Sequence, residues 1–215
     1  AGAWKIDVPF PQTSTSNEFA LPRGWGVGHL LILEIGGRLL AISPYSQNGQ
    51  PKPLLVWSRD MVEGNRMSGL QVTRPVPGFA PASVNYLDPF DRVIAVVGPV
   101  RSSYLCVQTR GRLVSLDTAS GQLLWERYEL PRNAICTGDD EAIYLISPEE
   151  SRVETLRPTD GAQVAVHPLA GFEPGRSDNP AVLMAGSSSA LVQRAGEEGR
   201  AFVVDLKTGR HAWSL

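Results

Sequence analysis

The chain has 215 residues, which suits one domain and allows a sizeable hydrophobic core. Its 20 basic and 22 acidic residues give a net charge of −2, so it lacks the positive excess that nucleic-acid binding and attachment to an anionic membrane surface require. No apolar run approaches the roughly 18 residues of a membrane-spanning helix, since the longest is Leu30–Leu33.

Glycine supplies 21 and proline 17 of the residues, about half as much again as their usual combined share of roughly 12%. Such frequent helix breakers favour short strands joined by turns. Two cysteines do not make a disulfide framework, and three scattered histidines predict no metal site. The chain has no initiator methionine and no signal-peptide pattern, so we expect that residue 1 is not the natural start.

The first predicted elements are one isolated strand and one unit of four strands. Residues 1–10 carry Trp4 in a context similar to that of Trp125, and we therefore expect them to form an outer strand. Residues 22–58 follow as a complete unit, with a long loop before its last strand and Trp57 near its end. The region 58–91 is rich in proline and glycine and is predicted to be a connection.

The second unit, residues 92–130, contains the clearest copy of a sequence repeat. An aspartate is followed by a glycine after four positions and by a tryptophan after four more: Asp117, Gly121 and Trp125. The third unit, residues 133–168, keeps only the glycine of this pattern, Gly161. A connection at 167–179 separates it from the fourth unit.

The fourth unit, residues 180–215, repeats the full spacing with Asp205, Gly209 and Trp213. Four short strands in roughly 40–50 residues is the period of a propeller blade. The sequence therefore predicts an all-β fold, a partial β-propeller of about four blades with four antiparallel strands each. Residues 1–10 would belong to a preceding or closing blade, and we expect the chain not to form a closed ring by itself.

Each part of the repeat has a physical role. The aspartate side chain can accept backbone N–H bonds within a turn, and the glycine can adopt a positive φ. A tryptophan buries roughly 150–250 Å², and its recurrence at one place predicts that Trp57, Trp125 and Trp213 pack between blades.

Segments 113–125 and 202–213 resemble the pyrroloquinoline-quinone-type propeller repeat, whose pattern is similar to L-x-A-L-D-x-x-T-G-x-x-x-W. The chain is most similar to the non-enzymatic bacterial members of this family. The resemblance implies a ring of seven or eight blades, of which half or more would lie outside this chain. It also implies one of two functions, because the family contains quinone-dependent dehydrogenases and binding scaffolds without a cofactor.

The resemblance to the quinone enzymes implies an adjacent cysteine pair, calcium ligands and a catalytic aspartate. Cys106 and Cys136 are far apart in the sequence, and no set of acidic residues matches the calcium ligands. We therefore predict no catalytic residue, no cofactor site and no metal site in this chain. The leading hypothesis is a non-catalytic scaffold that binds an unidentified protein or ligand on loops at one end of the ring, with the remaining blades of the same protein as further partners.

The alternative is a quinoprotein oxidoreductase whose active site lies in blades absent from this chain. A third possibility is a sensor or binding module within a larger protein. The family likeness favours the cell envelope or periplasm as the location.

Other motifs have simpler structural interpretations. The glycines of 24–28 precede a strand and not a helix, which argues against a phosphate-binding loop. The acidic sequence 138–141 lacks EF-hand spacing and is predicted to be a polar turn and not a calcium site. Cys106 and Cys136 are expected to be buried, reduced and too far apart to bond, because they fall on different strands of adjacent blades.

Overall fold

The computed structural model describes residues 23–35, 38–45, 53–61, 95–109, 111–131, 133–173, 180–193 and 201–214. These ranges form four antiparallel sheets of four strands, and no helix occurs in them. Within these ranges no helix is long and apolar enough to cross a membrane. The prediction of an all-β partial propeller with four blades is confirmed.

Each sheet is a meander in which sequential strands pair. Blade 1 contains β1 (Arg23–Val27), β2 (Leu30–Ile35), β3 (Arg38–Ser43) and β4 (Leu54–Asp60). Blade 2 contains β5 (Val96–Val100), β6 (Leu105–Thr109), β7 (Arg112–Leu116) and β8 (Leu123–Tyr128). Blade 3 contains β9 (Ile135–Gly138), β10 (Ile143–Ser147), β11 (Arg152–Leu156) and β12 (Gln163–Pro168). Blade 4 contains β13 (Ala181–Gly186), β14 (Ser189–Gln193), β15 (Ala201–Asp205) and β16 (Arg210–Ser214).

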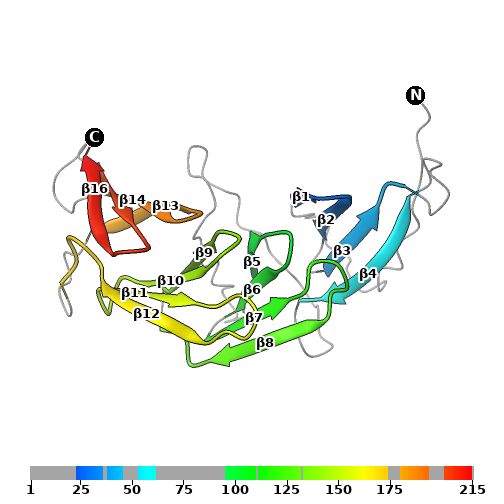
Figure 1. Cartoon of the computed structure of the whole chain (residues 1–215), viewed down its shortest axis with the longest axis horizontal. Coiled ribbons are helices and arrows are strands. Elements are labelled where there is room, and N and C mark those ends of the chain that lie inside the picture. The colour runs from blue at the N-terminus through cyan, green and yellow to red at the C-terminus, as the bar shows by residue number, and fades with distance from the viewer. Residues whose placement is uncertain are drawn as a thin grey trace, which may run out of the picture.

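The four blades follow an open arc, with blade 1 and blade 4 at its two ends (Figure 1). The first strand of each blade lies on the inner side of the arc and the fourth on the outer side. Among the described residues β16 pairs with β15 alone, so blade 4 does not pair with blade 1. The predicted strand around Trp4 lies outside the described residues.

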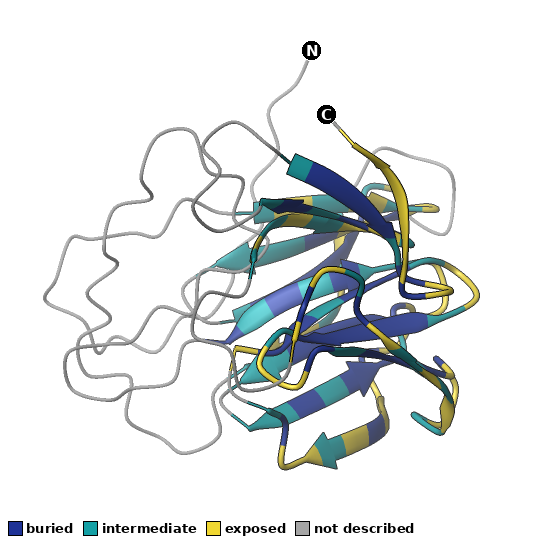
Figure 2. Ribbon diagram, turned by 90° about the vertical axis from the view of Figure 1, so that its left-hand side faces the viewer, coloured by how far each residue is buried: buried dark blue, intermediate teal, exposed yellow. Residues whose placement is uncertain are grey.

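The hydrophobic core is divided among the interfaces between successive blades. Of its three clusters, one lies between blades 1 and 2, one between blades 2 and 3, and one between blades 3 and 4. Strand β10 is buried on both faces, since Ile143 and Leu145 face blade 2 while Tyr144 and Ile146 face blade 4. A strand covered on both faces has a continuous apolar sequence, which explains the run Ile-Tyr-Leu-Ile. Figure 2 shows the buried middle strands and the exposed outer strand β16.

A tryptophan on the outer strand joins each of the first two blades to the next. Trp57 Nε1 donates to the carbonyl of Thr118 at 3.0 Å, and Trp125 Nε1 donates to the carbonyl of Pro158 at 2.7 Å. Each acceptor lies three positions before the glycine of the turn between the third and fourth strands of the following blade. The same docking geometry therefore occurs at two interfaces.

The turn glycine provides the surface on which the indole lies. A Cβ atom at Gly121 would lie 2.6 Å from Trp57 Cδ2, and one at Gly161 would lie 2.6 Å from Trp125 Cδ2. Both glycines also have positive φ angles, 68° and 69°. Any other residue at these positions would collide with the ring and strain the turn.

The aspartates of the repeat shape these turns by accepting hydrogen bonds within them. Asp117 Oδ1 accepts from the backbone N–H of Ser120 at 2.7 Å. Asp205 accepts from the backbone N–H of Lys207 at 3.0 Å and from the hydroxyl of Thr208 at 2.9 Å. In blade 3, Arg157 replaces the aspartate, and Asp160 caps the turn by accepting from the N–H of Ala162 at 3.0 Å.

The interface between blades 3 and 4 has no docking tryptophan, because Ala165 occupies the corresponding position. The end of β12 and the residues after it cover the turn glycine, Gly209, instead. A Cβ atom at Gly209 would lie 2.9 Å from His167 Cβ, and the N–H of Ala170 donates to the carbonyl of Gly209 at 2.9 Å. Backbone contact at this interface thus takes the place of the indole.

The face of blade 4 that points away from blade 3 carries an apolar row with one residue on each strand. Residues paired across the sheet form this row: Met184, Leu191, Val203 and Trp213. Trp213 is 52% exposed, whereas Trp125 is 8% exposed. The repeat predicts that both tryptophans pack between blades, but no described blade lies against Trp213.

We predict that Trp125→Ala lowers the free energy of unfolding by about 3–5 kcal/mol, because it removes a buried indole and leaves a cavity between blades. Trp213→Ala is the matched control, since the same substitution at an exposed site of the same repeat should change stability by only about 0.5 kcal/mol. Urea denaturation followed by circular dichroism measures both. Equal effects of the two substitutions would contradict the docking of Trp125.

Candidate functional site

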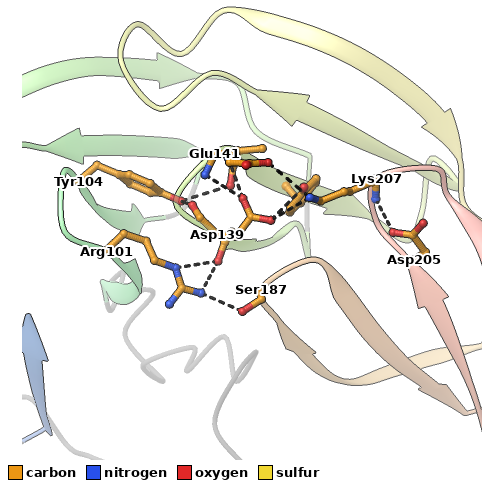
Figure 3. Close-up of polar contacts among 10 residues, drawn as sticks. Arg101, Tyr104, Asp139, Glu141, Ser187, Asp205 and Lys207 are labelled. Carbon is orange, nitrogen blue, oxygen red and sulfur yellow. Dashed lines mark hydrogen bonds and ion pairs between the residues drawn. The ribbon is translucent and has the colours of Figure 1, made fainter.

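The turns between the first and second strands and those between the third and fourth strands lie at the same end of each blade, because neighbouring strands are antiparallel. We call this end the turn face. Polar side chains from three blades meet there (Figure 3). They come from the segment after β5, from the turns after β9 and β13, and from the turn after β15.

Arg101 connects blades 2, 3 and 4 at the turn face. Its Nε and Nη2 atoms both donate to the carbonyl of Gly138, with Nε at 3.0 Å. Nη2 also donates to Ser187 Oγ at 3.2 Å. A planar guanidinium presents donors in several directions, and it can therefore hold two neighbouring turns at once.

Tyr104 makes a second contact between blades 2 and 3. Its side chain is fully buried, and its hydroxyl donates to the carbonyl of Asp139 at 2.7 Å. Burial raises the pKa of the Tyr104 phenol far above its usual range, so the group is a neutral donor. Gly138 makes this approach possible, because a Cβ atom there would lie 2.5 Å from the phenolic oxygen.

Asp139 organises the turn that receives these contacts. Its Oδ1 atom accepts from the backbone N–H groups of Glu141 and Ala142 at 3.0 and 2.9 Å. Its Oδ2 atom accepts from the Tyr144 hydroxyl at 3.4 Å and lies 3.7 Å from Lys207 Nζ. Partial burial acts to raise the pKa of Asp139, but the two backbone N–H groups, Lys207 and the Tyr144 hydroxyl together outweigh it, and the pKa falls below the usual value. The carboxylate is therefore ionised at neutral pH.

Lys207 extends the contacts to blade 4. Its Nζ atom lies 3.6 Å from Glu141 Oε2 as well as near Asp139, and the side chain of Glu141 is 84% exposed. Exposed ion pairs of this kind contribute about 0–1 kcal/mol each. Together we call Arg101, Tyr104, Asp139, Glu141, Ser187 and Lys207 the three-blade polar network.

The geometry of this network is that of a structural contact. Arg101 and Tyr104 are directed at backbone carbonyls, and both oxygens of Asp139 already accept hydrogen bonds. In the part of the chain that the structure describes, no group of three or more His, Cys, Asp or Glu side chains could hold a metal ion. The segment 138–141 is a polar turn, as its sequence indicates.

A buried carboxylate escaped the sequence analysis. Glu154 on β11 is only 1% exposed and lies 2.7 Å from Arg127 Nη2 of blade 2 and 2.9 Å from Arg152 Nη2. The signal was an acidic residue at the centre of a short strand, directly after the apolar Val153. Because Arg127 and Glu154 belong to different blades, this ion pair also joins blade 2 to blade 3.

Two of the histidines, His167 and His211, lie closer together than the sequence indicates. His167 and His211 both line a groove of about 350 Å³ at the interface between blades 3 and 4, together with Pro168 and Arg210. The His211 ring stacks on Phe202 with centroids 5.5 Å apart. Both histidines therefore help to pack this interface.

Two expectations for the cysteines need correction. Cys106 is buried as predicted, but Cys136 is only half-buried. The expectation that they lie apart also needs correction, because Cys136 packs against the hydrophobic cluster that contains Cys106. The repeat places them on different strands of different blades, and it does not reveal that the Cys136 side chain packs against the cluster around Cys106.

We predict that Glu154→Ala lowers the free energy of unfolding by about 1.5–3 kcal/mol, because two partly exposed arginines lose their charge-assisted hydrogen bonds to a buried carboxylate. Glu150→Ala is the matched control: its carboxylate lies 3.0 Å from the same Arg152, but the side chain is 41% exposed. The control should change stability by about 0–1 kcal/mol. Urea denaturation compares the two, and similar losses would contradict a special role for Glu154.

The sequence was also compared with known proteins. It matches no protein-family model and no curated protein. Solved structures with a similar fold include BamB from Moraxella catarrhalis, with 14% identity and a TM-score of 0.43 over 92% of this chain and 51% of that one. Apo AztD from Citrobacter koseri has 15% identity and a TM-score of 0.46 over 89% of this chain and 45% of that one.

A third similar structure is the β-propeller domain of Cps50 (Swd1) from Myceliophteria thermophila, with 10% identity and a TM-score of 0.46 over 87% of this chain and 57% of that one. The chain thus spans about half the length of these proteins. Such low identities concern the fold alone, and the four blades of this chain follow from its own strand pairing.

Proposed function

We propose that this chain is a non-catalytic part of a β-propeller of the pyrroloquinoline-quinone repeat type, and that it binds a protein partner on its turn face. The observation that carries the proposal is the three-blade polar network. It fixes turns from three blades into one surface through contacts with backbone carbonyls, and a rigid arrangement of loops lowers the entropic cost of binding. Asp140 and Glu141 project from this surface and are exposed.

The repeat type rests on the spacing of its residues. The same interval from aspartate to glycine to tryptophan occurs in blades 2 and 4, and the tryptophan of blade 2 docks on the next turn glycine. In this proposal the positions that recur in the repeat have a structural role and build the blades. The partner binds to the turns, where the exposed charged residues differ from blade to blade.

The remaining blades of the same protein are a second proposed partner. The apolar row of blade 4 is equivalent to the row in blade 1 that packs on blade 2: Trp25, Ile32, Ala41 and Trp57. A further blade with a turn glycine would give Trp213 the environment that Trp57 and Trp125 already have. The family resemblance favours the cell envelope or periplasm as the location of such a protein, and this location is part of the proposal.

A quinoprotein oxidoreductase remains the alternative, and the same repeat supports it. In that case the quinone and its calcium ion would be bound by residues of other blades. Cys106 and Cys136 are not adjacent in the sequence, and among the residues of the three-blade polar network no nucleophile lies beside a general base.

Site-specific photocrosslinking tests the binding surface. We expect a photoreactive amino acid at Asp140, on the turn face, to give one discrete protein adduct in cells that make the natural protein. The control position is Glu150, which is equally exposed but lies at the other end of β10. Equal adducts from both positions, or an adduct from Glu150 alone, would contradict the turn face as the binding surface.

Reconstitution separates the scaffold from the enzyme. We expect that the natural protein, mixed with pyrroloquinoline quinone and calcium, gains no bound quinone absorbance after desalting and oxidises neither alcohols nor sugars. Retained absorbance together with dye reduction would favour the quinoprotein alternative.

A further inference from the structure

Residues 104–108 of blade 2 and residues 134–139 of blade 3 form a ladder of side-chain contacts, and these segments contain most of β6 and all of β9. Residues 104, 106 and 108 share one face of blade 2, because side chains alternate along an extended strand. At one end Tyr104 donates to the carbonyl of Asp139 at 2.7 Å, and at the other end Gln108 Nε2 donates to the carbonyl of Ala134 at 2.6 Å.

The hydrogen bonds of Tyr104 and Gln108 bracket one residue on each segment, and both of these residues are cysteines. Residue 106 is midway between 104 and 108, and Cys136 lies between the two acceptors on the facing strand. Cys136 packs against the hydrophobic cluster that contains Cys106. Burial, and after it the neighbouring Cys136 thiol, raise the pKa of the Cys106 thiol. The two cysteines of the chain therefore form the central contact of this ladder.

The two thiols differ in their access to solvent. Cys106 is fully buried, and Cys136 is half-buried at the edge of the same cluster. A small oxidant can therefore reach Cys136 first. Only the thiol of Cys106 lies beside it to complete a reaction.

We propose that Cys106 and Cys136 are a site of oxidative modification, at which a low-molecular-weight disulfide converts the two thiols into one disulfide between blades 2 and 3. In the first step the Cys136 thiolate attacks the small disulfide RSSR, which forms a mixed disulfide and releases RS⁻. In the second step the released RS⁻ takes the proton of Cys106, because burial raises the pKa of this thiol, and the Cys106 sulfur attacks the Cys136 sulfur and releases a second RS⁻. The two protons from the protein thiols end on the two released RSH molecules, so the protein loses two electrons and RSSR gains them.

The product would link two blades through positions that are thirty residues apart in the sequence. The closed loop includes β7 and β8, so the bond would restrict the unfolded chain and also fix the blade interface. We expect the oxidised chain to unfold at a higher urea concentration than the reduced chain, and dithiothreitol should reverse the difference.

Peptide mapping tests the proposal directly. The folded chain is incubated with glutathione disulfide, quenched in acid and digested with trypsin without reduction. We expect one linked pair of peptides, 102–110 with 133–152, lighter by two hydrogen atoms than the sum of the separate peptides. We also expect the free thiols per chain to fall from two to none. Two free thiols, glutathione on both cysteines, or a disulfide between two chains would overturn the proposal.

Two variants test the order of the steps. In Cys106→Ala no second thiol is available, so Cys136 should keep one glutathione as a mixed disulfide. In Cys136→Ala the remaining thiol is buried, and Cys106 should stay unmodified in the folded chain. Neither variant should gain stability upon oxidation. Glutathione on Cys106 in Cys136→Ala, or a midpoint shift in either variant as large as that of the wild-type chain, would contradict the mechanism.

Discussion

The packing of an outer-strand tryptophan on the turn glycine of the next blade is the contact on which the propeller depends. A four-stranded meander alone has two faces to cover, and each blade covers one face of its neighbour. The indoles of Trp57 and Trp125 fill these interfaces and donate to the same carbonyl position of the turn they meet. The glycine is essential, because a side chain at Gly121 or Gly161 would occupy the space of the ring.

This contact always runs from one blade to the blade that follows it in the sequence, and this order explains which tryptophans are buried. Each tryptophan points to the blade that follows in the sequence, so its counterpart in blade 4, Trp213, is exposed at the end of the arc. The docked turns belong to the turn face, where Arg101 and Tyr104 add polar contacts between blades. The contacts that assemble the blades thus also fix the surface that we propose for binding.

The fold could be predicted from the sequence, whereas much of the site could not. The interval from Asp117 to Gly121 to Trp125 is a local pattern, and its return at Asp205 indicates a repeated blade. Tyr104 and Asp139 are far apart in the chain and belong to no pattern, so their contact depends on how two blades pack. The neighbouring thiols of Cys106 and Cys136 were missed for the same reason. A repeat reveals which strand a residue occupies, but not which side chain faces it across an interface.

A double-mutant cycle between Trp125 and Gly161 tests the docking contact most directly. The single variants are Trp125→Ala and Gly161→Ala, and the free energy of unfolding is measured for each variant and for the combination. A methyl group at Gly161 collides with the indole only while the indole is present, so the double variant should lose less stability than the two single losses combined, with a coupling of about 1–3 kcal/mol. Losses that add within about 0.5 kcal/mol would show that the two residues do not act together and would contradict the account.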